Sequence, residues 1–265
     1  MALTSAEGWP HREKDWAFHL SLGTGWVLEN AEGKLLGTLL CSEFDNQLAM
    51  LGLIVVDQHY QGMGLGRRLM EVARKTLKQE TLRLVSTEAG YNLYRHFGFK
   101  PVTPIEQRQA QLAGVEALPL APREVVRPAT SADAEHIYRL DEQAFGADRQ
   151  RLLSQLLDTG DCMVQQQSGR LSGFAILRDS GKGSVVGPVV AVDQSAAKTL
   201  VSHLLAGRSL FCRIDVPRHA GALAAWLDKV GLHAVDRVTA MQNGPVAMSQ
   251  NNRFHTYALV SQALG

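Results

Sequence analysis

The feature that most constrains the fold of this chain is an internal repeat. The segment Gly25–Gly37 (GWVLENAEGKLLG) resembles the segment Asp161–Gly173 (DCMVQQQSGRLSG). Each has a short apolar run, a polar turn that contains glycine, and a second apolar run, which is the pattern of a β-hairpin. Nearly the same offset aligns Leu93–Phe99 with Trp226–Leu232. Because several matches occur in the same order at a nearly constant offset, the sequence predicts two copies of one fold.

The composition of the middle of the chain indicates where the two copies meet. Residues 108–123 contain Gln, Ala, Gly and the prolines Pro119 and Pro122, without sustained apolar periodicity. This composition is typical of a linker. We therefore predict a first domain over 1–107, a linker over 108–123 and a second domain over 124–265. A chain of 265 residues with 45% hydrophobic and 20% charged residues is large enough for two domains of ordinary size.

The two predicted copies differ at their start. The second opens with a strand at Glu124–Arg127 and a helix that we expect to run to Ala144, with Ser131 as its N-cap. At the repeat offset, Met1 corresponds to Ile137, in the middle of that helix. We therefore expect the first copy to lack the first strand and half a helix. An upstream start, a truncation or replacement by another segment would each account for this.

The first copy mixes helical and strand patterns. Helices are expected at about Arg12–Leu22, Gly64–Lys78 and Asn92–Phe97, and strands at Trp26–Glu29, Leu35–Ser42, Leu48–Val56, Leu82–Ser86 and from Phe99 onward. This alternation predicts an α+β (α/β layered) fold.

Charge and apolar patterning argue against several classes of protein. The formal net charge of +1 gives no broad basic field for nucleic acid. The longest apolar runs, such as Val185–Val192, are far shorter than the roughly 20 residues of a membrane span. The three cysteines Cys41, Cys162 and Cys212 are widely spaced within apolar runs, which predicts buried reduced thiols and a cytoplasmic location.

The most informative local motif is the glycine-rich turn that follows the strand ending at Val56. Glycine occurs at every second position, at Gly62, Gly64 and Gly66, and a helix begins at once. Such a turn can direct backbone N–H groups at a phosphate, and the helix N-terminus adds its unpaired N–H groups. A tight turn without a ligand is the alternative. The Gly-Lys-Ser/Thr ending of a Walker A loop is absent, and the turn follows the third surviving strand, whereas a dinucleotide fingerprint follows the first.

Together with a second motif, this turn resembles the GNAT N-acetyltransferases. Gln61-Gly62-Met63-Gly64-Leu65-Gly66 matches the family's Gln/Arg-x-x-Gly-x-Gly/Ala, and Leu93–Phe99 matches its Leu-Tyr-x-x-x-Gly-Phe. Gln58 departs from the proline that the family usually has. The resemblance covers residues 9–107. The whole chain resembles tandem GNAT proteins with a degenerate second domain, which implies a mixed, mostly antiparallel sheet flanked by helices in each copy.

The resemblance implies a role for each matching residue. It implies that acetyl-CoA is the co-substrate and that backbone groups of one strand lie beside the pantetheine arm while the glycine turn holds the pyrophosphate. The cofactor-binding residues implied in this way are Leu53, Ile54, Val55, Val56, Gln61, Gly62, Met63, Gly64, Leu65, Gly66, Arg67 and Thr87. Tyr94 falls where family members have a tyrosine that protonates the leaving thiolate. The alternative for Tyr94 is a core aromatic residue.

The general base is not identified by the sequence. Family members often use a glutamate on the strand before the glycine turn, but Leu48–Leu53 contains no acid. Candidates elsewhere are Glu43, Asp45, His11 and Glu88. A water relay, or an amine that arrives neutral, would need no base.

The second copy lacks the residues of this chemistry. Asp193–Ala197 replaces the glycine turn, no glycine occurs between Gly187 and Gly207, and Leu227 stands at the tyrosine position. We therefore expect this copy not to bind acetyl-CoA. Three roles are open to it: shaping the acceptor pocket, binding a regulator, or stabilising the first copy. Acceptor binding is preferred, with Asp148, Arg149 and Asp215 as candidate polar contacts, and helix capping or surface ion pairing is the alternative for these three residues.

The sequence thus predicts acetyl transfer from acetyl-CoA to a primary amine, with a small-molecule acceptor preferred over a protein amine. The alternative is a non-catalytic acyl-CoA sensor with an effector site in the second domain. No metal, nucleic-acid or membrane partner is expected.

Overall fold

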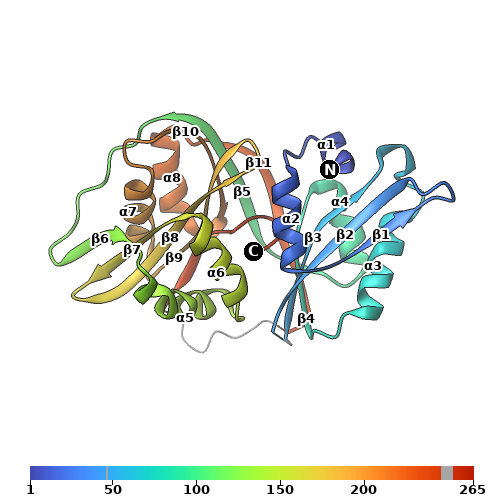
Figure 1. Cartoon of the computed structure of the whole chain (residues 1–265), viewed down its shortest axis with the longest axis horizontal. Coiled ribbons are helices and arrows are strands. Elements are labelled where there is room, and N and C mark those ends of the chain that lie inside the picture. Colours follow the sequence, from blue (N-terminus) through green and yellow to red (C-terminus); the bar gives the residue numbers. More distant parts are fainter. Residues whose placement is uncertain (46, 246–252) are drawn as a thin grey trace. The chain divides into compact units, whose positions relative to one another are not determined.

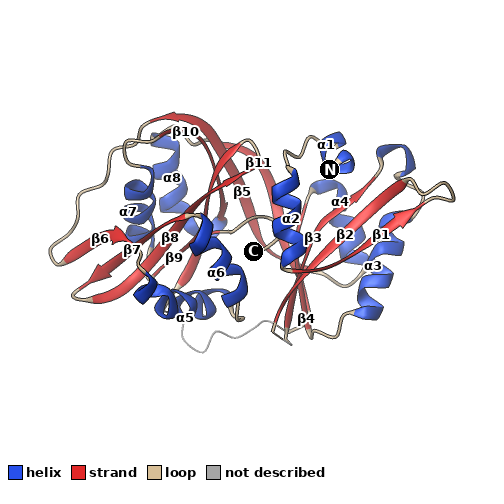
Figure 2. Ribbon diagram, viewed as in Figure 1, coloured by secondary structure: helices blue, strands red, loops and turns tan. Residues whose placement is uncertain are grey.

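The computed structural model describes residues 1–45, 47–245 and 253–265, which form two compact units. Unit 1 contains Met1–Val102 together with residues 239–245 and Gln262–Gly265, whereas unit 2 contains Thr103–Val238 together with residues 253–261. Both units combine helices with strands (Figure 2), which confirms the predicted α+β class. Among the helices of the described ranges, none combines the length and the apolar character of a membrane span.

Unit 1 contains most of the first sequence copy. Its elements are α1 (Ala2–Ala6), α2 (Glu13–Ser21), β1 (Gly23–Glu29), β2 (Leu35–Phe44), β3 (Leu48–Val56), the 3-10 turn η1 (Gln58–Tyr60), α3 (Leu65–Thr76), β4 (Thr81–Ser86) and α4 (Glu88–His96). The strand order is β1-β2-β3-β4, followed by β11 (Ala234–Asn243). Figure 1 shows the elements from α1 to α4 in blue to blue-green. The predicted helices and strands of this copy are confirmed, except that α4 begins earlier than expected.

Helix α3 follows the glycine turn because its sequence is amphipathic. Leu69, Met70 and Ala73 are buried, whereas Arg67 and Arg68 are exposed. Spacings of three and four residues place the apolar side chains on one face of the helix. That face packs on buried residues of β3 and β4 in a common core, so the end of β3 and the start of α3 are held together by the hydrophobic effect.

Unit 2 contains most of the second copy. Its elements are β5 (Lys100–Ala113), β6 (Glu124–Pro128), the 3-10 turn η2 (Ser131–Asp133), α5 (Ala134–Phe145), α6 (Gln150–Thr159), β7 (Asp161–Gln167), β8 (Arg170–Ser180), β9 (Gly183–Ala191), α7 (Gln194–Leu205), β10 (Ser209–Pro217), the 3-10 turn η3 (Arg218–Ala220), α8 (Gly221–Lys229) and β12 (His255–Ala258). The strand order is β5-β10-β9-β8-β7-β6, and β12 pairs with β9. The predicted N-cap Ser131 is wrong: Thr130 forms a capping box with Asp133 at the start of η2.

The two sequence copies exchange one strand each. In unit 1, Thr239–Asn243 of β11 pair antiparallel with Leu82–Ser86 of β4. In unit 2, β5, which follows α4 of the first copy, pairs antiparallel with β10 from Ile105↔Pro217 to Ala113↔Ser209. The compact units therefore divide the chain differently from the predicted domains 1–107 and 124–265.

The predicted linker over 108–123 is wrong for residues 108–113, because β5 extends to Ala113. This part of β5 is rich in glutamine, and its buried positions include Arg108. The Arg108 guanidinium donates hydrogen bonds to Glu106 at 2.6 Å, Asp228 at 2.7 Å and the carbonyl oxygen of Leu232 at 3.1 Å. A buried arginine is tolerated because its charge is paired and its donors are used, so this strand has no apolar alternation to detect.

The first copy was expected to lack the first strand of the second copy, and the described residues show this difference. In unit 2, β6 pairs with β7 and forms the outer strand. In unit 1, β1 corresponds to β7, and no described strand lies beyond β1.

Candidate functional site

The two parallel strands at the centre of unit 1 separate partway along their length. β3 and β4 pair from Leu48↔Thr81 to Leu51↔Leu84. Beyond this point β3 continues to Val56 and β4 to Ser86 without further pairing. A Cβ built on Gly52 would lie 2.5 Å from the side chain of Ala263, so the C-terminal segment of unit 1 packs against β3 at this residue. The β4-facing edge of residues 53–56 pairs with no strand in the described part of unit 1, and its backbone N–H and C=O groups can pair with an extended ligand.

A bulge in β3 stands at the point of separation. The β2–β3 register shifts between Thr38 and Leu40, and Leu53 has a φ of 47°. The buried Thr38 hydroxyl donates a hydrogen bond to the carbonyl oxygen of Leu53 at 2.9 Å. A bulge bends its strand and increases the local twist, which accounts for the divergence of β3 from β4. Positive φ at a leucine is strained and persists only where neighbouring contacts hold it.

The glycine turn follows the divergent end of β3. Gly62 has a φ of 76° and Gly64, the N-cap of α3, has a φ of 81°. A Cβ built at either position meets no protein atom within 4 Å, so the outer side of the turn is open. Because the first N–H groups of α3 have no helical partner, this open turn fits a phosphate group.

The side chains around the turn differ in role. Gln61 donates to the carbonyl oxygen of Val56 at 3.2 Å and to the Glu7 carboxylate at 2.9 Å, so it stabilises the turn. Arg67 is exposed in the first turn of α3 and places a positive charge beside the open N–H groups. Met63 is 68% exposed and contributes no packing that would close the turn.

Tyr94 lies on α4, which begins directly after β4. Thr87 caps this helix by accepting a hydrogen bond from the Gly90 N–H at 3.4 Å. A Cβ built on Gly90 would lie 3.3 Å from the Tyr94 hydroxyl oxygen, so this hydroxyl lies beside the first turn of α4. Tyr94 is 7% exposed, and burial raises the pKa of its phenol well above the ordinary value. The hydroxyl therefore stays protonated near neutral pH and can act as a donor.

A contact between the two helices joins the turn to the tyrosine. A Cβ built on Gly66 would lie 3.3 Å from a methyl carbon of Leu93, the residue before Tyr94. Glycine at this position lets the start of α3 approach α4 closely. The structure thus groups the end of β3, the glycine turn and the start of α4 in one region of unit 1.

The four candidates for a general base differ in their distance from the glycine turn and α4. Glu43 pairs in register with Ala49 near the beginning of β3, so at about 3.3 Å per residue it lies roughly 20 Å from the glycine-turn end. Asp45 follows the same end of β2 and accepts a hydrogen bond from the Gln47 N–H. Glu88, in contrast, lies in the first turn of α4. His11 contacts the rings of Trp9 and Trp16.

The candidate contact residues of unit 2 are engaged in internal interactions. Arg149 forms a fully buried ion pair with Asp141 at 2.7 Å, and its guanidinium lies 3.7 Å from the centroid of the Phe145 ring. Asp215 is buried and paired with Arg213 at 2.8 Å. Asp148 accepts a hydrogen bond from the Gln150 N–H. In the described ranges, no group of histidine, cysteine and acidic side chains is arranged to hold a metal ion.

Unit 2 repeats the separation of parallel strands but not the open edge. β9 and β10 pair in parallel from Ser184↔Cys212 to Val186↔Ile214. Beyond that point, Val189–Ala191 of β9 pair antiparallel with β12. β12 is not apparent from the sequence, because its four residues give too short a pattern to distinguish from a loop. At the glycine-turn position, the Asp193 side chain caps α7 by accepting from the Ala196 N–H at 2.8 Å.

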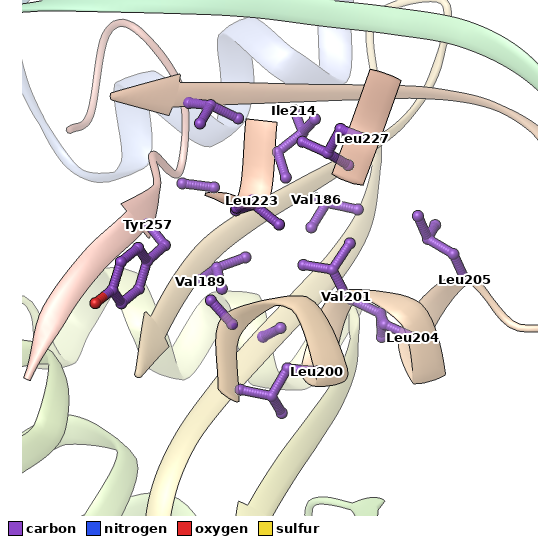
Figure 3. Packing of buried hydrophobic residues seen from close by; sticks show 14 of the residues in the cluster. Val186, Val189, Leu200, Val201, Leu204, Leu205, Ile214, Leu223, Leu227 and Tyr257 are labelled. Atoms are coloured by element: carbon purple, nitrogen blue, oxygen red, sulfur yellow. The ribbon is translucent and has the colours of Figure 1, made fainter. Parts of the chain in front are cut away.

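The core of unit 2 also contains the residue at the tyrosine position. Leu227 is fully buried in one hydrophobic cluster with Leu223, Val201 and Tyr257. Figure 3 shows this cluster, with Leu227 next to Ile214 and Tyr257 at its margin. Leu227 is therefore a packing residue, as its apolar side chain requires.

Comparison with known proteins agrees with these observations. A family model for the acetyltransferase (GNAT) domain matches residues 21–101, and a second model of the same description matches residues 137–257. The uncharacterized N-acetyltransferase YitH of Bacillus subtilis is 28% identical over 274 residues, which cover 100% of this chain and 94% of that protein.

Solved structures show the same fold over the full length. A structure from Pyrococcus horikoshii, described as that of a putative acetyltransferase, has a TM-score of 0.76 at 21% identity, covering 99% of this chain and 90% of the other. A tandem GNAT protein from the clavulanic acid biosynthesis pathway has a TM-score of 0.64 at 16% identity, covering 92% and 93%. The chain belongs to the GNAT acetyltransferase family and carries two GNAT domains in tandem.

Proposed function

We propose that this protein transfers an acetyl group from acetyl-CoA to a primary amine, with a small-molecule acceptor preferred, and that the reaction takes place in unit 1. The observation that carries the proposal is the unpaired edge of β3 over residues 53–56, beyond Gly52, which leads directly into the glycine turn. The pantetheine arm of acetyl-CoA is extended, contains amides and ends in a pyrophosphate. It needs an unpaired strand edge for the amides, followed by a turn with free N–H groups for the phosphates.

The residues present fit acetyl-CoA. Backbone groups of Leu53–Val56 would pair with the amides of the pantetheine arm as an added strand would. The N–H groups around Gly62, Gly64 and the first turn of α3 would hold the pyrophosphate, since the open space over both glycines leaves room for it. Arg67 would add charge at the rim of this site.

Acetyl-CoA supplies an activated acetyl group as a thioester. In the transfer, the amine nitrogen forms a bond to the acetyl carbon, the carbon–sulfur bond breaks, and the sulfur takes up a proton. We assign the donor of that proton to Tyr94, because its hydroxyl lies beside the first turn of α4, in the region that the contact of Gly66 with Leu93 joins to the glycine turn. The amine loses a proton to water or arrives neutral, and β3 itself offers no carboxylate before the glycine turn.

The absence of an acid on β3 favours one alternative, a sensor that binds acyl-CoA without turnover. Titration calorimetry with acetyl-CoA, followed by an assay of free thiol release with a panel of amines, separates the two functions. Binding with thiol release supports the enzyme, and binding without release for any amine supports the sensor. No binding to the folded chain would refute both.

We also infer a cytoplasmic location, because all three cysteines are free thiols in the structure. Detection of a disulfide among Cys41, Cys162 and Cys212 in protein isolated under alkylating conditions would count against it.

A further inference from the structure

The place in unit 2 that corresponds to the proposed acetyl-CoA site already contains a strand of the chain. β9 separates from β10 after Val186↔Ile214, as β3 separates from β4 after Leu51↔Leu84. A register shift marks the bend in both cases, between Ala175 and Leu177 in β8 and between Thr38 and Leu40 in β2. On the edge that becomes free, β12 pairs with Val189–Ala191.

Both diverging strands contact this segment. Register pairs join His255 to Ala191, Thr256 to Val190 and Ala258 to Val189. On the other side, the Leu259 N–H donates to the carbonyl oxygen of Asp215 on β10 at 3.0 Å. The segment thus lies between β9 and β10 and satisfies backbone groups that an extended ligand would otherwise meet.

Side chains hold β12 in this position. Tyr257 and Ala258 are buried in the core of unit 2, and Tyr257 lies beside Val189 in Figure 3. The His219 ring nitrogen Nε2 lies 3.0 Å from the carbonyl oxygen of Thr256, which can only accept a hydrogen bond. Buried apolar area and used backbone groups both favour retention of the strand.

Gly187 has a specific relation to the same segment. A Cβ at this residue would lie 1.8 Å from the carbonyl oxygen of Leu259, closer than any real contact. Glycine is therefore required where β9 bends away from β10, because the residue after β12 approaches its backbone. The close contact between β9 and the segment that contains β12 therefore extends beyond the paired residues Val189–Ala191 to Gly187.

We infer that β12 is a self-supplied occupant of the cofactor position of unit 2, where it makes the main-chain contacts that the pantetheine arm makes in unit 1. Loss of the glycine turn is then not the sole reason that unit 2 takes no acetyl-CoA: the strand-pairing half of the site is filled as well. The comparison of β12 with the pantetheine arm rests on the proposed function, which places acetyl-CoA in unit 1.

Hydrogen exchange of the full-length chain, followed by mass spectrometry, tests the inference. We expect acetyl-CoA to slow exchange at Leu53–Val56 by at least tenfold and to leave Val189–Ala191 unchanged. Slower exchange at Val189–Ala191 with acetyl-CoA would overturn the inference. If acetyl-CoA changes neither segment, the proposed function fails, and the variants below decide the position of β12 without ligand.

The variant Gly187→Ala should raise exchange at Val189–Ala191 at least tenfold, because its methyl group displaces Leu259. Gly207→Ala is the matched control, since its Cβ meets no atom within 4 Å and its φ of 66° imposes backbone strain alone. Tyr257→Ala, which loosens β12 without altering β9, serves if Gly187→Ala does not fold, and the same increase is expected. Unchanged exchange at Val189–Ala191 in a folded displacing variant would overturn the inference.

Discussion

The hydroxyl of Thr38 donates a buried hydrogen bond to the carbonyl oxygen of Leu53, fifteen residues away in sequence, at 2.9 Å. This bond joins β2 to the bulged residue of β3, which has a φ of 47°. Since the open edge of β3 begins at this bulge, Thr38 stabilises the local geometry on which the proposed site depends.

Thr38→Val should therefore destabilise the fold and weaken acetyl-CoA binding. The substitution leaves a buried carbonyl group without its partner, at a cost of about 1–3 kcal/mol in the free energy of unfolding. Urea denaturation and calorimetry would measure the two effects. Thr38→Ser, which keeps the hydroxyl, is the control, and equal binding by both variants would contradict the role of this bond.

Gly64→Asp should weaken acetyl-CoA binding at least tenfold, which corresponds to about 1.4 kcal/mol. The new carboxylate would repel a phosphate at the open turn, and a φ of 81° disfavours any side chain. Gly64→Ala introduces the backbone strain without the charge and should bind better than the aspartate variant. Unchanged calorimetric affinity in folded Gly64→Asp would remove the phosphate site from this turn.

Tyr94→Phe should lower the turnover rate by a factor of about 10² to 10⁴ while acetyl-CoA affinity stays nearly constant. The hydroxyl acts on the departing sulfur, whereas the ring provides packing against Phe99, with the ring centroids 6.3 Å apart. Tyr91→Phe, on the same helix, is the matched control and should keep full activity. Full activity in Tyr94→Phe would remove the acid assignment and leave the cofactor site standing.

One acetyl-CoA should bind per chain. Unit 2 has a helix-capping aspartate, Asp193, at the turn position and the strand β12 beside β9. Calorimetric titration of the intact protein would give the stoichiometry. Two equivalents per chain would show that unit 2 is competent and would contradict both structural reasons.

A fragment that ends at residue 107 should not fold as a cooperative unit. It lacks β11, which covers the β4 edge from Leu82 to Ser86 and supplies the buried Met241 to the core of unit 1. An unpaired edge and a lost core side chain together cost more than a small domain tolerates. Thermal unfolding followed by circular dichroism would test this, with the full chain as reference; a sharp transition in the fragment would refute it.

The features of this protein that could be predicted from the amino-acid sequence are those that depend on neighbouring residues. Apolar spacing placed the strand Leu48–Val56 and the helix that starts near Gly64, and alternate glycines marked the turn between them, because helix period and positive φ are local properties. The repeat of Gly25–Gly37 at Asp161–Gly173 indicated two related folds for the same reason. The family motifs drew attention to Tyr94, but its burial and raised pKa come from packing.

The pairing of distant strands, in contrast, is set by tertiary packing. Thr239–Asn243 of β11 pair with β4, which lies more than 150 residues earlier in the chain. His255–Ala258 of β12 pair with β9, from which several helices and strands separate them in the sequence. The backbone edge of every strand carries the same N–H and C=O groups, so a strand's sequence does not specify its neighbour. The choice depends on side chains that meet only in the folded core, such as Met241 with Leu84 and Tyr257 with Val189. For this reason the exchanged strands and the filled position in unit 2 appear in the structure and not in the sequence pattern.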